Sequence, residues 1–326
     1  MRDDAVAPII AIMLILAAVA TFFVIFNGAY IPSLKEASEI EHIRNVESSF
    51  QRFSSDIETA ISLRQDNLIL GEPVQLGGGE CLFNTLRSGG SLAIEDEPEP
   101  AYNLSLYNSS GIMLSEMNST LATITYSPAG NFWQDQGYRW QRGYLNVTKY
   151  GTRQVPLSYN NMTDVMNDFD DNTSSLYAFA RSFGSVEFTR NLTTLFPDYD
   201  ENGNITAYLP REGNCSGITI TVIHISASPD HPFTSSNGVG TLQLKTVVNT
   251  TTHPDVGWVA VTSHIQQFGN RTLDRFNDSF SEADSACGSN IDYLGYIGDT
   301  QYLYLRQTVS PVSVKVKTVM IEIGAY

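Results

Sequence analysis

The chain of 326 residues begins with one unbroken apolar stretch, after which apolar and polar positions alternate. No charged residue occurs between Ala5 and Leu34. A bilayer core of about 30 Å is crossed by roughly 20 apolar residues in a helix, and this stretch is longer than that. A secretory signal peptide has a shorter apolar core followed by a small-residue cleavage site. The pattern therefore predicts a membrane-inserted helix over residues 5–34.

Residues 35–66 keep a helical period, with a narrow apolar stripe along one face. The stripe recurs at three- and four-residue steps and comprises Ile40, Ile43, Val46, Phe50, Phe53, Ile57 and Ile61. Charged residues occupy the other faces. Such a stripe packs either against a sheet or against neighbouring helices. Together with the apolar stretch it predicts a helical rod about 90 Å long from Ala5 to Asp66.

From residue 67 onward the chain consists of short runs in which apolar and polar residues alternate. The clearest runs are Tyr102–Tyr107, Leu121–Tyr126, Ile218–Ile225, Thr241–Val248, Tyr302–Arg306 and Val312–Ile323. Alternation with turn residues between the runs predicts antiparallel strands with one solvated face. Two polar stretches, Thr163–Arg181 and Thr272–Ala286, are expected to form short helices or loops. We therefore expect an α+β protein, with a β-rich and sandwich-like domain over residues 67–326.

Sequons for N-glycosylation, Asn-x-Ser/Thr, are unusually frequent, and all of them follow the apolar stretch. Composition alone would give roughly four, whereas twelve occur, at Asn103, Asn108, Asn118, Asn146, Asn161, Asn172, Asn191, Asn204, Asn214, Asn249, Asn270 and Asn277. Because glycosylation takes place outside the cytoplasm, this distribution predicts a cell-surface glycoprotein whose C-terminal portion lies outside the cell.

The net charge of −16 restricts the partners of the chain. A chain this acidic does not bind nucleic acid through a general basic surface, and anionic headgroups would repel it. Three cysteines, Cys81, Cys215 and Cys287, allow at most one internal disulfide, and their spacing does not say which two pair.

One loop carries a candidate metal site. Asp198, Asp200 and Asn202 alternate ahead of Gly203, as at the start of a calcium-binding loop. The twelfth position is Leu209, so the closing carboxylate is missing, and the Asn202–Gly203 pair is equally typical of a plain hairpin turn. Calcium is thus the one cofactor that the sequence raises, with a plain turn as the alternative.

The sequence contains no motif typical of an enzyme. It has no GxSxG nucleophile elbow, no P-loop and no dinucleotide fingerprint. Aromatic residues gather at Phe132, Trp133, Tyr138, Trp140 and Tyr144, where a buried core is favoured over stacking on a glycan or a partner. We therefore expect a structural or binding protein rather than an enzyme.

The N-terminus resembles a known family. The stretch Ala5-Val6-Ala7-Pro8-Ile9-Ile10-Ala11, preceded by Asp3 and Asp4, is similar to the N-terminus of archaeal type IV pilins and pilin-like proteins, which carry class III signal peptides. Ala7 and Ala11 stand where the family usually has Ser and Gly. The resemblance covers about the first 30 residues. It implies cleavage by a prepilin peptidase between Asp4 and Ala5.

The resemblance also implies an organisation and a function. Residues 1–4 form a short charged leader, residues 5–34 a transmembrane and assembly helix, residues 35–66 an amphipathic helix and residues 67–326 an extracellular head. The expected function is that of a glycosylated structural subunit, which joins identical or related pilin subunits through its N-terminal helix in a surface filament for adhesion or attachment. The alternative is a monomeric surface-binding protein that the same helix anchors permanently in the membrane.

Overall fold

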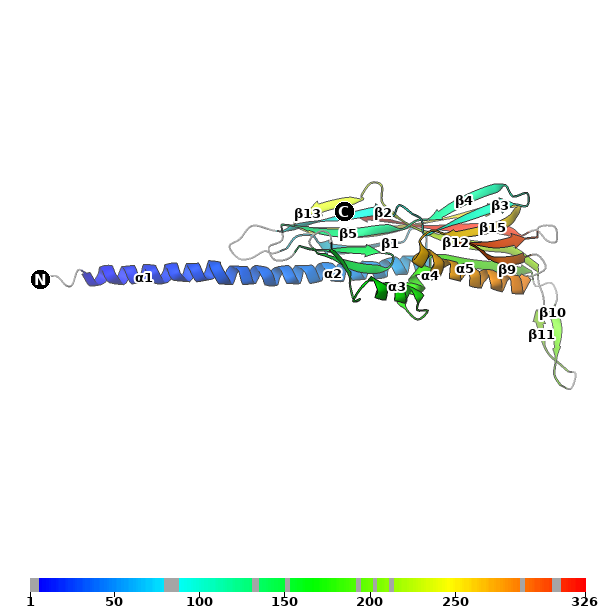
Figure 1. Ribbon diagram of the computed structural model, residues 1–326, viewed down its shortest axis with the longest axis horizontal. Helices are drawn as coiled ribbons and strands as arrows, with labels where there is room; N and C mark the ends of the chain where they lie inside the picture. The colour runs from blue at the N-terminus through cyan, green and yellow to red at the C-terminus, as the bar shows by residue number, and fades with distance from the viewer. Residues whose placement is uncertain are drawn as a thin grey trace.

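A long helix at the N-terminus leads into an elongated β-rich head (Figure 1). The computed structural model describes residues 6–78, 88–130, 135–149, 153–191, 195–201, 204–210, 214–287, 291–306 and 312–326. This arrangement confirms the α+β class and the sandwich-like head.

The long helix is continuous over three segments. They are α1 (Val6–Ile25), a π-helical turn η1 (Phe26–Tyr30) and α2 (Ile31–Leu63). Arg64 ends the helix in the left-handed conformation with φ 48°, and its N–H donates to the carbonyl of Ala60 at 3.0 Å. This is a common way for a helix to satisfy its last carbonyl groups.

Three sheets and one hairpin make up the strands of the described head. The mixed sheet has the order β1 (Ile69–Gln75), β14 (Val239–His253), β18 (Ser313–Ala325), β12 (Asn214–Ala227) and β9 (Gly184–Asn191). The proximal sheet, nearer the N-terminal helix, has the order β13 (Phe233–Ser236), β2 (Gly89–Asp96), β5 (Ala122–Ala129), β6 (Gln136–Gln141), β7 (Tyr144–Lys149) and β8 (Arg153–Pro156).

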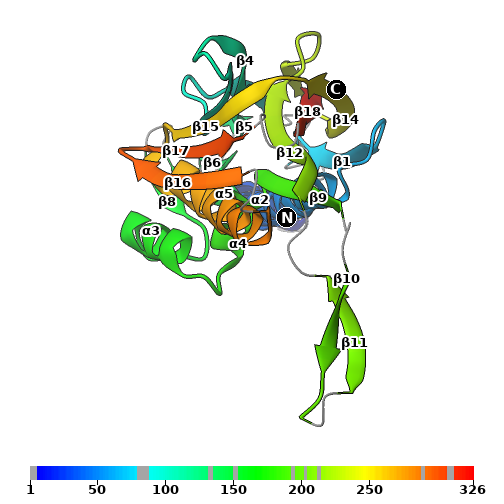
Figure 2. The ribbon, with the colours of Figure 1, turned by 90° about the vertical axis from the view of Figure 1, so that its right-hand side faces the viewer.

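The distal sheet lies at the far end of the head (Figure 1), with the order β16 (Ile291–Ile297), β17 (Thr300–Leu305), β15 (Val256–Ser263), β3 (Tyr102–Asn108) and β4 (Met113–Ser119). The hairpin of β10 (Leu195–Tyr199) and β11 (Ile205–Pro210) projects away from the sheets, as the view along the long axis shows (Figure 2).

The strand directions differ from the expectation at one place. The expected antiparallel pairing holds for most neighbours, but β12 and β18 run parallel over eleven paired positions from Gly217–Ser313 to Ala227–Ile323. The last strand, β18, enters the sheet between β12 and β14 and is antiparallel to β14. Alternation within a strand is the same for both directions, so only the connections of the chain decide this pairing.

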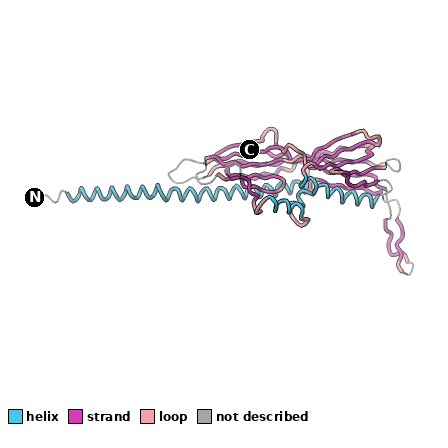
Figure 3. The backbone as a smooth tube through the Cα atoms, viewed as in Figure 1, coloured by secondary structure: helices cyan, strands magenta, loops and turns pink. Residues whose placement is uncertain are grey.

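Each of the two main helices packs along the sheets of one half of the head. The helix α2 packs on β1 of the mixed sheet and on β6 and β7 of the proximal sheet. Beyond the end of α2, α5 (Gln266–Cys287) packs on β9 of the mixed sheet and on β15, β16 and β17 of the distal sheet. The backbone tube shows both helices along the long axis of the molecule (Figure 3).

Both polar stretches of uncertain type are helical. The first, Thr163–Arg181, forms α3 (Met162–Asp170) and α4 (Ser175–Arg181), and the second lies within α5. Asn161 accepts from the N–H of Asp164 at the start of α3, and Ser174 accepts from the N–H of Tyr177 at the start of α4. Such N-caps satisfy amide groups that would otherwise lack partners.

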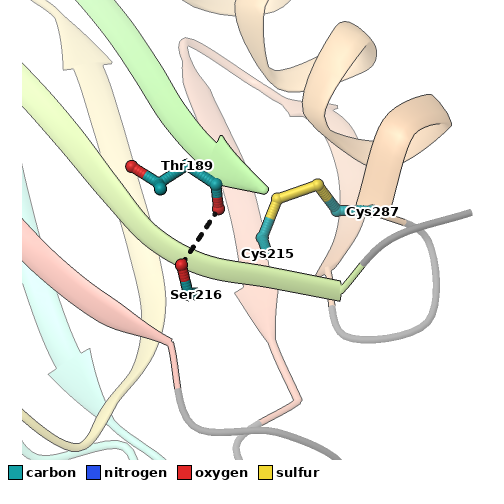
Figure 4. The surroundings of a disulfide bond; sticks show 4 residues. All are labelled: Thr189, Cys215, Ser216 and Cys287. Atoms are coloured by element: carbon teal, nitrogen blue, oxygen red, sulfur yellow. Dashed lines mark hydrogen bonds between the residues drawn. A yellow bond between two sulfur atoms is a disulfide. The ribbon is translucent and has the colours of Figure 1, made fainter. Parts of the chain in front are cut away.

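A disulfide between Cys215 and Cys287 fixes the distal end of the head (Figure 4), with the two Cα atoms 5.4 Å apart. It joins the start of β12 to the last residue of α5. Next to it, the Ser216 hydroxyl donates to the carbonyl of Thr189 at 3.4 Å and links β12 to β9. Of the three pairings that the sequence left open, the structure forms this one, and Cys81 lies outside the described residues.

Candidate membrane and assembly surface

The helix α1 exposes apolar side chains on every face. From Ile10 onward, where its side chains are described, every residue of α1 is exposed, and Phe26, the first residue of η1, is partly buried. Exposed fractions of large side chains reach 65% at Leu14, 63% at Phe22 and 70% at Val24. One helix in the described residues, Ile10–Leu63, is long and apolar enough to cross a membrane, and none of its most apolar window is buried in the head. Its surface can only be covered by lipid or by other chains.

The length of α1 matches a bilayer. Its 20 residues rise by about 30 Å, the thickness of a hydrocarbon core. Polar side chains near its end bond to the helix itself: the Thr21 hydroxyl donates to the carbonyl of Ala17 at 2.7 Å, and Asn27 Nδ2 donates to that of Phe23 at 2.9 Å. Because these donors are satisfied within the helix, burying them in an apolar medium costs less than burying unpaired groups.

The π-helical turn η1 follows from Pro32. In a regular α-helix, a proline ring clashes with the carbonyl four residues earlier, here that of Gly28. The wider turn relieves this contact, and the N–H of Ile31 donates to the carbonyl of Phe26 five residues back. The helix therefore widens locally before Pro32 but remains continuous.

The apolar stripe of α2 packs against sheets. The sequence had left open whether it packs against a sheet or against neighbouring helices, and within a single chain it packs against sheets. Its buried members are Ile43, Val46, Phe50, Phe53, Ile57 and Ile61, whereas Ile40 is 36% exposed. Phe50 contacts Tyr138 of β6 with ring centroids 6.2 Å apart. The stripe therefore holds the head firmly on the helix that carries the apolar surface.

Polar groups are buried where the helix first meets the head. Glu39 and His42 are each only 3% exposed, and His42 Nε2 lies 3.0 Å from the hydroxyl of Tyr126 on β5. Burial lowers the pKa of His42, and the carboxylate of Glu39 opposes this shift. The sequence reasoning missed both residues, although the same spacing finds them, since Glu39 precedes Ile43 and His42 precedes Val46 by four residues.

The aromatic group on β6 and β7 belongs to the core. Tyr138, Trp140 and Tyr144 are 0%, 2% and 7% exposed. The indole N–H of Trp140 donates to the Ser54 hydroxyl of α2 at 2.9 Å. These three residues thus pack the head on α2, as the favoured interpretation expected, and Phe132 and Trp133 lie outside the described residues.

The sequons differ in accessibility. Exposed asparagines among them are Asn118, Asn161, Asn172, Asn204, Asn249 and Asn270. Partly buried ones are Asn103, Asn108 and Asn277. Asn146 is 1% exposed, and neither the nitrogen nor the oxygen of its side-chain amide has a hydrogen-bond partner among the described residues. The side chains of Asn191 and Asn214 lie outside the described residues. A sugar fits the exposed positions without disturbing the fold, whereas at Asn146 it would displace core residues.

The candidate calcium loop lies in the β10–β11 hairpin. The carboxylate of Asp200 accepts from the N–H of Asn204 at 2.8 Å and from its Nδ2 at 3.1 Å. Asn202 and the side chain of Asp198 lie outside the described residues. Within the part of the chain that the structure describes, no group of three His, Cys, Asp or Glu residues is placed to hold a metal ion. The described contacts are those of a hairpin turn, and calcium stays a prediction.

The predicted leader and its cleavage point, Asp4 and Ala5, also lie outside the described residues. No protein-family model, curated protein sequence or solved structure matches this chain. The chain itself presents an exposed apolar helix that continues into a helix packed against a β-rich head.

Proposed function

We propose that the chain is a structural subunit of an archaeal type IV pilus-like filament at the cell surface, with a glycosylated head that serves adhesion or attachment. The observation that carries this proposal is the apolar surface of α1, which is exposed on all sides and continuous with a helix that packs tightly into the head. A head held this way follows the helix as one body when helices associate.

The same surface suits two environments in turn. In the bilayer, lipid covers the side chains of α1 over a length that matches the hydrocarbon core. In a filament, the helices of neighbouring subunits cover them instead, and small residues such as Ala11, Ala17 and Ala18 permit close approach of helix backbones. Assembly then exchanges lipid contacts for helix–helix contacts without exposing apolar surface to water.

Removal of the leader fits this exchange. Arg2, Asp3 and Asp4 directly precede the apolar stretch. Burying their charges in an apolar filament core is unfavourable, because a charge taken out of water needs a partner. Cleavage by a prepilin peptidase between Asp4 and Ala5 leaves an uncharged side-chain surface from Ala5 to Leu34 for association.

Mass spectrometry of the native protein tests this function together with electron microscopy of material sheared from cells. We expect a mature chain that begins at Ala5, carries glycans on exposed sequons, and occurs in filaments. A chain that begins at Met1 and is found only in membrane fractions would favour the permanently anchored monomer. The variant Ile112→Arg places a charge at a position of the head that is 63% exposed and leaves the helix unchanged. It is the control and is expected to give the same mature N-terminus and the same filaments as the unmodified protein.

A further inference from the structure

A pocket at the middle of the head gathers three arginines from three different elements. Arg64 follows α2, Arg181 ends α4 and Arg275 lies within α5. The pocket has a volume of about 400 Å³, in the range of small-molecule sites. Among the described residues its lining contains no carboxylate, although the chain has 35 acidic residues and only 19 Lys and Arg. Asp278 and Glu187, whose charges act on Arg181 and Arg64, are not among the lining residues, so the lining itself is positively charged.

The first two arginines are held in place. Arg64 Nη1 donates to the Ser185 hydroxyl at 2.5 Å, and its Nη2 donates to the carbonyl of Ser182 at 3.4 Å. Arg181 pairs with Asp278 at 2.6 Å, and its guanidinium carbon lies 5.3 Å from the centroid of the Tyr177 ring. Arginines fixed in this way are preorganised to hold an anion, because little side-chain freedom remains to be lost on binding.

The third arginine provides unused binding capacity. Arg275 is exposed and forms no ion pair with any described residue. Burial lowers the pKa of Arg64, and the like charge of Arg275 adds to this shift, whereas Glu187 and Tyr102 oppose it. Two guanidinium groups thus repel each other across the pocket, and an anion placed between them would relieve the repulsion.

The remaining walls offer neutral hydrogen-bonding groups, namely the amide of Asn172 and the hydroxyls of Tyr177 and Ser185. The hydroxyl oxygens of Tyr177 and Ser185 already accept from Arg181 at 3.0 Å and from Arg64 at 2.5 Å, so each hydroxyl keeps its proton to donate to a ligand. A sugar acid presents a carboxylate for a guanidinium and several hydroxyls for the neutral groups. The combination of charge, polar walls and volume therefore favours an acidic monosaccharide unit over a bare anion.

We propose that this pocket binds a uronic acid unit, with its carboxylate between Arg64 and Arg275 and its hydroxyls toward Asn172, Tyr177 and Ser185. The site lies within one chain and needs no assembly of helices. The proposal extends the proposed function by naming a class of ligand for the head. Binding at this site can be tested independently of filament formation.

Calorimetric titration of the full chain in detergent micelles tests the site. A glycan at Asn172, which begins a sequon and lines the pocket, would obstruct the site, so the proposal requires that this one exposed sequon carries no glycan in the native protein. For the titration the protein is produced in a host without N-glycosylation. Glucuronate is the probe, and glucose and inorganic sulfate are the comparison ligands. We expect saturable binding of glucuronate, weaker binding of sulfate and no binding of glucose.

Substitutions identify the pocket as the binding site. Arg275→Gln removes the unpaired arginine at an exposed position, so the fold is expected to remain and glucuronate affinity to fall about tenfold or more. Arg306→Gln is the matched control, because Arg306 pairs with Asp292 outside the pocket. Arg275→Glu reverses the charge and is expected to abolish binding.

Four results would overturn the proposal. The first is no saturable binding of glucuronate, and the second is equal binding of glucose, which would remove the role of the arginines. The third is sulfate binding as tight as that of glucuronate, which would indicate a simple anion site. Unchanged glucuronate affinity in both Arg275 variants would place any binding elsewhere on the chain. Filament formation is scored separately and is not affected by any of these outcomes.

Discussion

His224 shows how the fold changes the chemistry of a single side chain. It lies in β12, next to the parallel strand β18, where its register partner is Met320. Burial lowers its pKa to about 4, well below the ordinary value near 6.5. The folded protein therefore keeps this imidazole neutral at a pH at which the unfolded chain already binds a proton.

We predict that the free energy of unfolding falls as the pH decreases from about 6.5 to 4. In this window the unfolded chain takes up a proton at His224 and the folded chain does not, so the contribution is complete above the unfolded pKa and is lost below it. The shift corresponds to about 3 kcal/mol. Urea unfolding at several pH values should show a flatter pH dependence for His224→Gln. Equal slopes in the two proteins would contradict the prediction.

The sequence predicted which side chains are buried only where apolar residues recur with a helical period. Six of the seven residues in the α2 stripe are buried. Glu39 and His42 are also buried on the same face, but they were not predicted because their side chains are polar. The partners of these groups could not be predicted, because Tyr126 is 84 residues from His42 in the chain. The same holds for the pocket arginines, which come together only when α2, α4 and α5 pack.

At the scale of elements, α2 is the part of the long helix that determines where the head sits. Its apolar stripe faces β1, β6 and β7. Phe53 lies in this stripe and is 1% exposed, whereas Ile40 of the same helix is 36% exposed.

We predict that Phe53→Ala destabilises the head by about 3–5 kcal/mol, because it removes a large buried ring and leaves a cavity. Ile40→Ala is the matched control and should have a much smaller effect. Chemical denaturation of the full chain in detergent, followed by tryptophan fluorescence, measures both. Similar losses for the two variants would mean that the stripe does not attach the head.

The disulfide joins two elements that are distant in the chain. Cys215 and Cys287 are 72 residues apart and connect β12 with α5. Closing a loop of this length reduces the freedom of the unfolded chain, which on chain-entropy grounds stabilises the fold by about 4 kcal/mol.

We predict that Cys287→Ser lowers the unfolding temperature, and that a reductant lowers that of the unmodified protein in the same way. The change Cys81→Ser is the matched control, since Cys81 takes no part in this disulfide. Thermal unfolding followed by circular dichroism gives the comparison. A reductant that still lowers the unfolding temperature of Cys287→Ser would point to another covalent link.

At the scale of the whole molecule, an apolar helix and an acidic head occupy opposite ends (Figure 1). The helix carries no charge from Val6 to Leu34, whereas the chain as a whole carries −16. This separation makes the helix suited to an apolar medium and the head suited to water.

We predict that the double variant Ile15→Arg with Val19→Arg fails to insert stably in membranes. Both positions lie near the middle of α1 and are exposed, and two arginines at a bilayer centre cost about 5–7 kcal/mol on insertion scales. Carbonate extraction of membranes, with Ile112→Arg in the head as control, measures the effect. Full retention of the double variant in the membrane would show that α1 is not the spanning segment.

The sequence by itself determined the long helix, its apolar and amphipathic parts, and the positions of six strands, β3, β5, β12, β14, β17 and β18. These features follow from local rules: the length of an uncharged stretch and the periods of 3.6 and 2 that set which side chains share a face. The runs Tyr102–Tyr107 and Ile218–Ile225, for example, lie within β3 and β12.

Only the tertiary structure decided which elements meet. It gave the sheets as partners of the α2 stripe, the parallel pairing of β12 with β18, the pairing of Cys215 with Cys287 and the pocket of three arginines. Each of these joins residues far apart in the chain. A local pattern encodes that a face is buried, but the contact that buries it depends on how the whole chain folds back on itself.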